Sequence, residues 1–375
     1  MKQKRPKGSK GDDYSLILQP GDGVDPIVRA IEEAKERIEI LIFRFDRSAI
    51  EQALVAAVTR GVAVQALIAW TNRGGERSLR NLETRLLAAG VTVSRTANDL
   101  ARYHGKMLIV DRKRLYLLAF NFTALDIEGS RSFGISTGSQ QLVQEAVKLF
   151  EADCSRQPYV PAPETLLISP INSRAELAAF LSAATKELLI YDPCIGDPQM
   201  VRLLEERSKA GVRIRIIGTL KRPNACLTAR PLAQMRLHTR TIIRDGRTAF
   251  LGSQSLRTIE LDGRREIGMF LTDARVIQKM TEVFEADWAL ADSAETQAVQ
   301  TLRGDKLAKK VAKAISKELP PVAEVIEAVA ADLPSHSVNV EGLDLESLEE
   351  TIRSAVKNVV KESIQQAAGG EPGST

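Results

Sequence analysis

The segment YHGKMLIVDRKRLYLLAFN, residues 103–121, places a histidine, a lysine and an aspartate within one short apolar stretch. Side chains alternate along a β-strand, so His104 and Lys106 point to the same face. The apolar runs on either side of the polar DRKR predict a β-hairpin. A turn centred in DRKR sets Asn121 opposite His104 on the second strand. The hairpin is therefore expected to gather a histidine, a cation and an amide in one place.

A second segment, MRLHTRTIIRDGRTAFLGSQS at residues 235–255, repeats this pattern. His238, Arg240 and Asp245 stand where the first segment has its histidine, lysine and aspartate, and the Asp-Gly pair strengthens the turn signal. The same construction sets Ser255 opposite His238. A single histidine on an apolar strand is more often a packed core residue than a catalyst. This chain has three histidines and uses two of them in equivalent frames, which indicates a functional site.

The repeat extends over most of the chain. LFEADC (149–154) and VFEADW (283–288) follow their histidines at the same distance, and TRGVAVQALIAW (59–70) resembles KAGVRIRIIGTL (209–220). Each member of the second pair has the pattern of a helix end, a glycine and an apolar strand. Between this strand and its motif the first half carries extra residues, which we expect to form a helix and a loop beside the site.

Alternating helix and strand patterns predict an α/β fold with two repeated domains, each with a mixed, largely parallel sheet sandwiched by helices. We expect a basic flexible N-terminus at residues 1–12, domains at 13–156 and 157–292, and a helical or partly disordered tail at 293–375. Packing of the two domains by pseudo-two-fold symmetry would bring both imidazoles into one cleft, within about 8 Å of each other.

Composition limits the class of protein. With 375 residues, 44% of them hydrophobic, the chain is long enough to bury two cores. We find neither a secretory h-region nor an apolar run long enough to span a membrane. The cysteines, Cys154, Cys194 and Cys226, are scattered and odd in number, which is typical of reduced thiols in a cytoplasmic protein. No spacing typical of metal ligands is present, so we expect no metal and no cofactor.

The net charge is only +4, but basic residues cluster toward both ends. DKLAKKVAKAISKEL, residues 305–319, sets Leu307, Val311 and Ile315 at four-residue spacing beside five lysines. Such a basic amphipathic helix can lie on an anionic membrane or along nucleic acid. It can equally pack its narrow apolar stripe on the protein or on a partner helix. We expect the tail to be a docking or oligomerisation segment, and peripheral membrane contact is one use of it.

The paired H-x-[KR]-x4-D frames inside a two-fold repeat resemble the phospholipase D superfamily, the HKD phosphodiesterases, over roughly residues 13–292. In that family the aspartate is followed by six residues and then by G-S-x-N. The second half here has GSQS, with Ser253 and Ser255, and the first half has LAFN, which keeps Asn121 without the Gly-Ser pair. The resemblance implies two phospholipase D-like α/β sandwich domains.

Two more positions depart from the family pattern. Arg240 replaces the family lysine, and Ser132 stands where the family places a glutamate that holds the histidine ring. The second half keeps this glutamate as Glu266, which we expect to hold the ring of His238. Each half lacks some of the family's site residues, but the two halves together contain nearly all of them. This favours one composite site built from both halves.

The resemblance implies phosphodiester chemistry without a metal. An anionic phosphodiester needs cations, a nucleophile and an acid for the leaving oxygen. By family precedent His104 attacks phosphorus to give a phosphohistidine, and His238 protonates the leaving group. Lys106 and Arg240 would then bind the nonbridging oxygens. The planar fork of arginine is larger than an ammonium group, so turnover with an H-x-R motif is expected to be reduced.

The remaining motif residues have supporting roles in this hypothesis. Asn121, Ser253 and Ser255 would donate hydrogen bonds to the substrate. Asp111 and Asp245 differ in strand parity from their histidines, so we expect them to be structural anchors at the two turns.

Three functions fit the sequence. The leading one is a phospholipid phosphodiesterase or phosphatidyltransferase, similar to phospholipase D or cardiolipin synthase and peripheral to the membrane. The second is a metal-independent nuclease, favoured by Arg240 and the basic ends, although only 5% of the residues are aromatic and few can stack on bases. The third is a catalytically weak protein that has kept a phosphate pocket. Turnover of lipid vesicles and of single-stranded DNA, both in chelator, would separate them.

Overall fold

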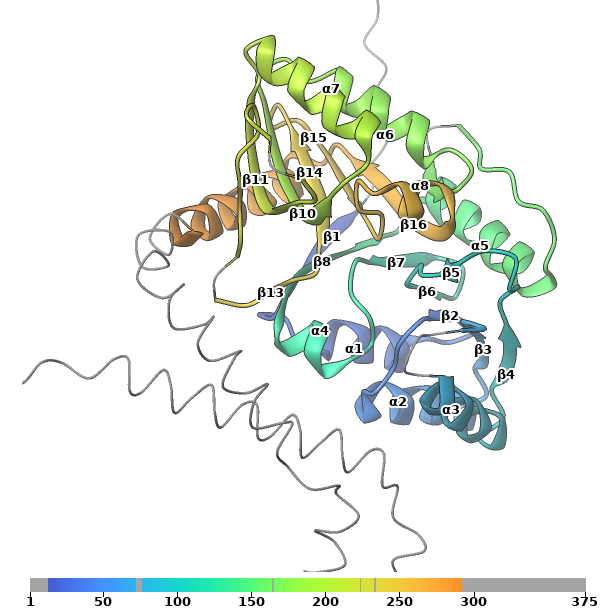
Figure 1. Ribbon diagram of the computed structural model, residues 1–375. Helices are drawn as coiled ribbons and strands as arrows, with labels where there is room; N and C mark the ends of the chain where they lie inside the picture. The colour runs from blue at the N-terminus through green and yellow to red at the C-terminus, as the bar shows by residue number, and fades with distance from the viewer. Residues whose placement is uncertain (1–12, 72–75, 164, 223, 233, 292–375) are drawn as a thin grey trace, which may run out of the picture. The chain divides into compact units, whose positions relative to one another are not determined.

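The computed structural model describes residues 13–71, 76–163, 165–222, 224–232 and 234–291 (Figure 1). The expected flexible N-terminus and the tail lie outside these residues. The first half runs β1 (Tyr14–Gln19), α1 (Asp25–Glu33), β2 (Arg37–Ile42), α2 (Ser48–Thr59), β3 (Ala63–Ile68), α3 (Glu76–Ala88), β4 (Thr92–Arg95), β5 (Arg102–Tyr103), β6 (Met107–Val110), β7 (Arg114–Leu118), α4 (Ala124–Glu128), β8 (Ser130–Thr137) and α5 (Gln140–Ser155).

The second half repeats this order from β9 onward. It runs β9 (Leu166–Ser169), α6 (Ser173–Ser182), β10 (Glu187–Ile195), α7 (Pro198–Lys209), β11 (Arg213–Leu220), β12 (Ala229–Arg230), β13 (Arg236–Leu237), β14 (Arg240–Arg244), β15 (Thr248–Gly252), α8 (Thr258–Asp262) and β16 (Arg264–Leu271). Residues 274–291 then form a helix that corresponds to α5. Two repeated α/β halves related by pseudo-two-fold symmetry are therefore confirmed.

Each half contributes one sheet. The first has the order β1-β8-β7-β6-β2-β3-β4, and the second has the order β12-β11-β10-β14-β15-β16-β5 with β9 paired to β16. Both sheets are mixed, but the prediction that they are largely parallel is wrong. The chain returns through the hairpins β6–β7 and β14–β15, and each hairpin pairs antiparallel with the neighbouring strand β2 or β10. Parallel pairing is confined to the βαβ units such as β2–β3 and β10–β11, and to short edge pairs.

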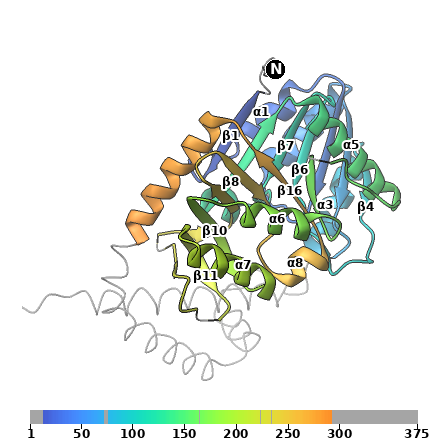
Figure 2. The same ribbon diagram turned by 90° about the horizontal axis from the view of Figure 1, so that it is seen from above.

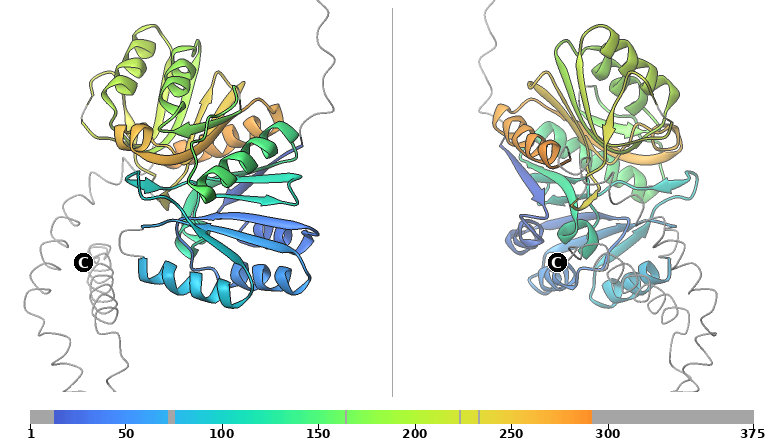
Figure 3. Two further views of the ribbon diagram at one scale, coloured as in Figure 1. Left: turned by 90° about the vertical axis from the view of Figure 1, so that its right-hand side faces the viewer. Right: turned by 60° about the vertical axis from the view of Figure 1, so that its left-hand side comes forward.

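The two sheets face each other across a shared apolar core. Side chains of both sheets, of α5 and of the helix at 274–291 meet in this cluster, including the fully buried Phe150 and Phe284 of the repeated FEAD motifs. Separate clusters lie on the outer faces, under α1, α2 and α3 on one side and under α6 and α7 on the other. Figures 2 and 3 show this layering. Because they share a core, the two halves form one compact unit.

The predicted helix ends are confirmed. Gly61 and Gly211 follow α2 and α7 with φ of 86° and 88°, a left-handed conformation that costs least at glycine. The extra residues of the first half form α3 and β4, which extend the first sheet beyond β3. None of the helices within the described ranges is long and apolar enough to span a bilayer.

The short strands before the two histidines exchange between the halves. β5 pairs in parallel with β16 of the second half, and β13 pairs in parallel with β8 of the first half. Each histidine therefore follows a strand that belongs to the other half's sheet. This exchange sets the geometry of the site.

The hairpin register also differs from the prediction. Val110 pairs with Arg114 and Arg244 with Thr248, so each turn contains three residues rather than two or four. Continuing this register sets Phe120, not Asn121, in line with His104. A turn with two residues at positive φ, Asp111 and Arg112, accounts for the shift by one position.

Candidate functional site

His104 is held by a carboxylate of the other half. The parallel pairing of β5 with β16 aligns His104 with Glu266, and His104 Nδ1 lies 2.8 Å from Glu266 Oε2. Both side chains are buried. The prediction that Glu266 holds the ring of His238 is therefore wrong. The spacing within one repeat is correct, but strand exchange presents this carboxylate to the histidine of the opposite repeat.

The second nitrogen of His104 faces a cation. Lys106 Nζ lies 2.9 Å from His104 Nε2 and donates to the His104 carbonyl at 2.6 Å. Burial, the charge of Lys106 and the charge of Arg240 lower the pKa of His104 well below its usual value. Burial raises the pKa of Glu266. These contacts assign a neutral imidazole that donates its Nδ1–H to Glu266 and keeps an Nε2 lone pair.

Lys106 is itself fully buried. Burial lowers its pKa to about 7, although the nearby Glu266 acts in the opposite direction. The ring of Phe43 supports this corner of the site, because its centroid lies 5.5 Å from Lys106 Nζ and its plane meets the His104 ring edge-on at 4.6 Å. An anion placed here would restore the charged form of Lys106.

His238, unlike His104, has no carboxylate partner at Nδ1 among the described residues. The pairing of β13 with β8 aligns it with Ser132, the position equivalent to Glu266. Both His238 Nδ1 and Ser132 Oγ are buried without a hydrogen-bond partner among the described residues. His238 Nε2 instead lies 3.4 Å from Asp126 Oδ2. Burial and Arg240 lower the pKa of His238, while Asp126 acts to raise it.

Asn121 and Asp126 form one buried unit. Asp126 Oδ2 accepts from the Asn121 backbone N–H at 2.9 Å and from Asn121 Nδ2 at 2.6 Å, and Arg236 donates to Oδ1. Asn121 Oδ1 has no partner within the described part of the chain. Asp126 thus links Asn121 of the first half to His238 and Arg236 of the second half.

The second half has an equivalent unit around Arg240. The backbone N–H of Ser255 donates to Glu260 at 2.8 Å, and Arg240 Nε donates to Ser255 Oγ at 3.3 Å. Arg240 Nη1 also donates to the His238 carbonyl at 2.5 Å. The Ser253 hydroxyl accepts a hydrogen bond from the backbone N–H of Ile267 at 3.0 Å, so it contacts the backbone of strand β16.

Sequence reasoning missed Asp126 and Glu260. The repeat itself carried the signal, because each acid lies five positions after Asn121 or Ser255. Asp126 lies in the short helix α4 and Glu260 in the short helix α8.

The two motif aspartates lie at the turns, as the parity argument predicts. Asp111 accepts from the backbone N–H groups of residues 35–37, and Asp245 accepts from those of residues 185–187, at 2.7 to 3.2 Å. Each aspartate thus fixes its hairpin to the start of β2 or β10.

These contacts bring His104, Lys106, His238, Arg240 and Glu266 into one electrostatic environment. Lys106 of the first half acts on His238, and Arg240 of the second half acts on His104. The separation of about 8 Å between the imidazoles stays a prediction. Among the described residues, no three His, Cys, Asp or Glu side chains gather as they do around a metal ion.

The fold and the paired motifs define a phospholipase D-like protein. The family described as "Cardiolipin synthase, PLD-like domain" matches residues 27–154 and 177–288, one match in each half. The chain therefore belongs to this family.

Individual proteins are similar to parts of this chain. Polyphosphate kinase of Pseudomonas aeruginosa is 26% identical over 251 residues, which cover 61% of this chain and 36% of that protein. The chain thus spans about a third of this curated relative. The fold resembles polyphosphate kinase of Porphyromonas gingivalis (TM-score 0.62, 18% identity, 74% of this chain and 50% of that one). It also resembles phosphatidylserine synthase of Haemophilus influenzae (TM-score 0.58, 12% identity, 73% and 85%).

Proposed function

We propose that the chain is a phospholipase D-like phosphodiesterase or phosphatidyltransferase that acts on phospholipid through a phosphohistidine at His104. The observation that carries this proposal is the asymmetry between the two histidines. His104 Nδ1 is held by buried Glu266 and its Nε2 lone pair faces Lys106 Nζ at 2.9 Å, whereas His238 Nε2 faces Asp126. A base-like nitrogen and a proton-bearing nitrogen are what a two-step displacement requires.

In the first step His104 Nε2 attacks phosphorus, and the bond from phosphorus to the leaving oxygen breaks. Asp126 and the bound anionic phosphate favour the imidazolium form of His238. This imidazolium gives its Nε2 proton to that oxygen, so an alcohol departs and a neutral imidazole remains. Lys106 and Arg240 neutralise the nonbridging oxygens as charge builds up on them. In the second step water or another alcohol gives a proton to His238 and displaces His104 from phosphorus. Glu266 stabilises the positive charge on His104 while the intermediate exists.

Two comparisons bear on the substrate. The family description names cardiolipin synthase, and the phosphatidylserine synthase fold is matched over 85% of its length. Both names concern phospholipids, which is why a phospholipid is the proposed substrate. The curated relatives named polyphosphate kinase favour a second candidate, phosphoryl transfer from polyphosphate by the same histidine.

The tail completes the proposal. Its lysines at 305–319 would attract an anionic bilayer and keep a cytoplasmic protein at the membrane surface. Oligomerisation through the tail and contact with nucleic acid are alternative uses of the same residues.

The test is turnover by the full chain in chelator on three substrates: phosphatidylglycerol vesicles, long-chain polyphosphate and single-stranded DNA. We expect release of the lipid headgroup, and a loss of about 10³-fold or more in His104→Asn and His238→Asn. Exposed Arg247→Gln is the control and should keep full activity. Acid-labile label trapped on His104 supports the assignment. Label on His238 would overturn the assignment of His104 as the nucleophile. Turnover of polyphosphate or DNA alone would overturn phospholipid as the substrate.

A further inference from the structure

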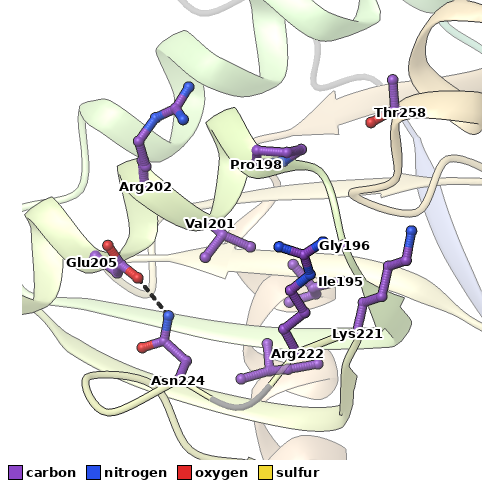
Figure 4. Close-up of a pocket in the computed structure, with 11 residues that line it drawn as sticks. Ile195, Gly196, Pro198, Val201, Arg202, Glu205, Lys221, Arg222, Asn224 and Thr258 are labelled. Atoms are coloured by element: carbon purple, nitrogen blue, oxygen red, sulfur yellow. Dashed lines mark hydrogen bonds between the residues drawn. The ribbon is translucent and has the colours of Figure 1, made fainter.

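A cavity lies in the second half, and neither His104 nor His238 lines it. It has a volume of about 440 Å³ and lies at the carboxyl ends of β10 and β11, beside the start of α7 (Figure 4). Gly196, Pro198 and Val201 form part of its wall, and Arg202, Lys221 and Arg222 project around it. The wall is thus apolar near the backbone and cationic at its edge.

The three cations are exposed. Arg202, Lys221 and Arg222 form no ion pair with any of the described residues, whereas other arginines of this half are paired, as in Arg215 with Glu285. The cavity has one carboxylate, Glu205, and this group already accepts a hydrogen bond from Asn224. Positive charges around a cavity attract an anionic ligand.

Lys221 is held in place. Its backbone N–H donates to the Ile195 carbonyl at 2.8 Å. Its side-chain stem lies directly on the backbone of Gly196, because a Cβ atom added there would be 3.0 Å from both Cβ and Cδ of Lys221. The absence of a side chain at Gly196 therefore leaves room for the lysine along the cavity wall.

One loop separates this cavity from the candidate site. Ser255 contacts Arg240 on one side, and Thr258, three residues later, lines the cavity on the other. Leu256 fixes the loop, since its N–H donates to buried Asp192 at 2.7 Å and its carbonyl accepts from Gly196 and Asp197 at 2.9 Å. Three residues span at most about 10 Å, so Ser255 and Thr258 lie close together.

We propose that this cavity is a phosphate-binding subsite, in which Arg202, Lys221 and Arg222 hold a phosphate group other than the one that reacts. One guanidinium group can bind two phosphate oxygens at once, and a lysine adds a further positive charge. These groups suit a dianionic phosphate. The group is either a second phosphate of the substrate or free inorganic phosphate. The link to turnover rests on the proposed function, but binding of phosphate by the cavity does not.

Binding is measured first, in the full chain carrying His104→Asn so that no turnover occurs. Calorimetric titration with inorganic tripolyphosphate, and separately with orthophosphate, is compared between this protein and the double variant Lys221→Gln/Arg222→Gln. We expect binding to weaken by about tenfold or more. The matched control is Lys209→Gln/Arg247→Gln, which removes two exposed cations of the same half outside the cavity. Equal binding by both double variants, whether both keep the wild-type affinity or both lose it, would overturn the subsite.

The second measurement identifies the source of the phosphate. If it belongs to the substrate, Lys221→Gln/Arg222→Gln in the otherwise native chain should raise KM for cardiolipin, which has two phosphates, and leave KM for phosphatidylcholine unchanged. If it is free phosphate, the variant should change only the response of turnover to added orthophosphate. Wild-type behaviour in the titrations and in both kinetic arms would overturn the inference while leaving the proposed function intact. If the unmodified chain turns over neither lipid but the two double variants differ in the titration as expected, only the proposed function is overturned.

Discussion

Glu266→Gln tests the assignment of His104 as the nucleophile. Glu266 is fully buried and accepts from His104 Nδ1 at 2.8 Å. Glutamine keeps the size of the side chain but removes its charge. The imidazole becomes positive as the bond from nitrogen to phosphorus forms, so the carboxylate stabilises the transition state more than it stabilises the neutral ring.

The magnitude follows from the type of hydrogen bond that is lost. A hydrogen bond to a charged group contributes about 1.5–3 kcal/mol. Since about 1.4 kcal/mol corresponds to a factor of ten in rate, phosphohistidine formation should slow by roughly 10- to 150-fold. Binding of substrate should change little, because the neutral ring contacts Glu266 before the attack.

The assay is a single-turnover measurement of label transfer to the protein by rapid quenching. The matched control is Ser132→Ala, which changes the equivalent position opposite His238, where the hydroxyl has no hydrogen-bond partner among the described residues. It should react within about twofold of the unmodified chain. The reasoning is refuted if Glu266→Gln reacts as fast as Ser132→Ala, or if Ser132→Ala is the slower of the two.

Three further predictions concern a buried cation, the proposed acid and the tail. Burial lowers the pKa of Lys106 to about 7. Above that pH the unfolded chain therefore binds more protons than the folded chain. The free energy of unfolding should rise by up to about 1.4 kcal/mol per pH unit between pH 7 and 10. Urea unfolding of Lys106→Met should lack this rise, and equal slopes in both proteins would contradict it. Asp126→Asn should slow cleavage of an alkyl phosphodiester by about 10²-fold but hardly affect a p-nitrophenyl ester, whose leaving group needs no acid; equal losses on both esters would exclude a role through His238. Deleting residues 293–375 should weaken vesicle flotation by roughly 1 kcal/mol per lysine near the surface and spare turnover of a short-chain soluble phosphodiester; undiminished flotation would remove the tail from the membrane hypothesis.

The sequence alone determined the repeat and the fold of each half. Equivalent spacing around His104 and His238, the glycines at 61 and 211 and the alternation of helix and strand patterns are local features, and local features predict local structure. The strand parity within each motif predicted that Asp111 and Asp245 anchor the turns, which fits their contacts with the starts of β2 and β10.

The tertiary structure decided which parts meet. Glu266 lies 28 residues after His238 in the chain, yet it contacts His104, because β5 joins the second sheet and β13 joins the first. A two-residue strand carries too little pattern to reveal its partner, and the energy of such a pairing comes from packing between segments far apart in the chain. Asp126 contacts His238 for the same reason, since the exchange brings His238 to it. The spacing of residues along the chain thus indicated which residues belong to the site. The long-range exchange of strands decided which side chains contact each histidine.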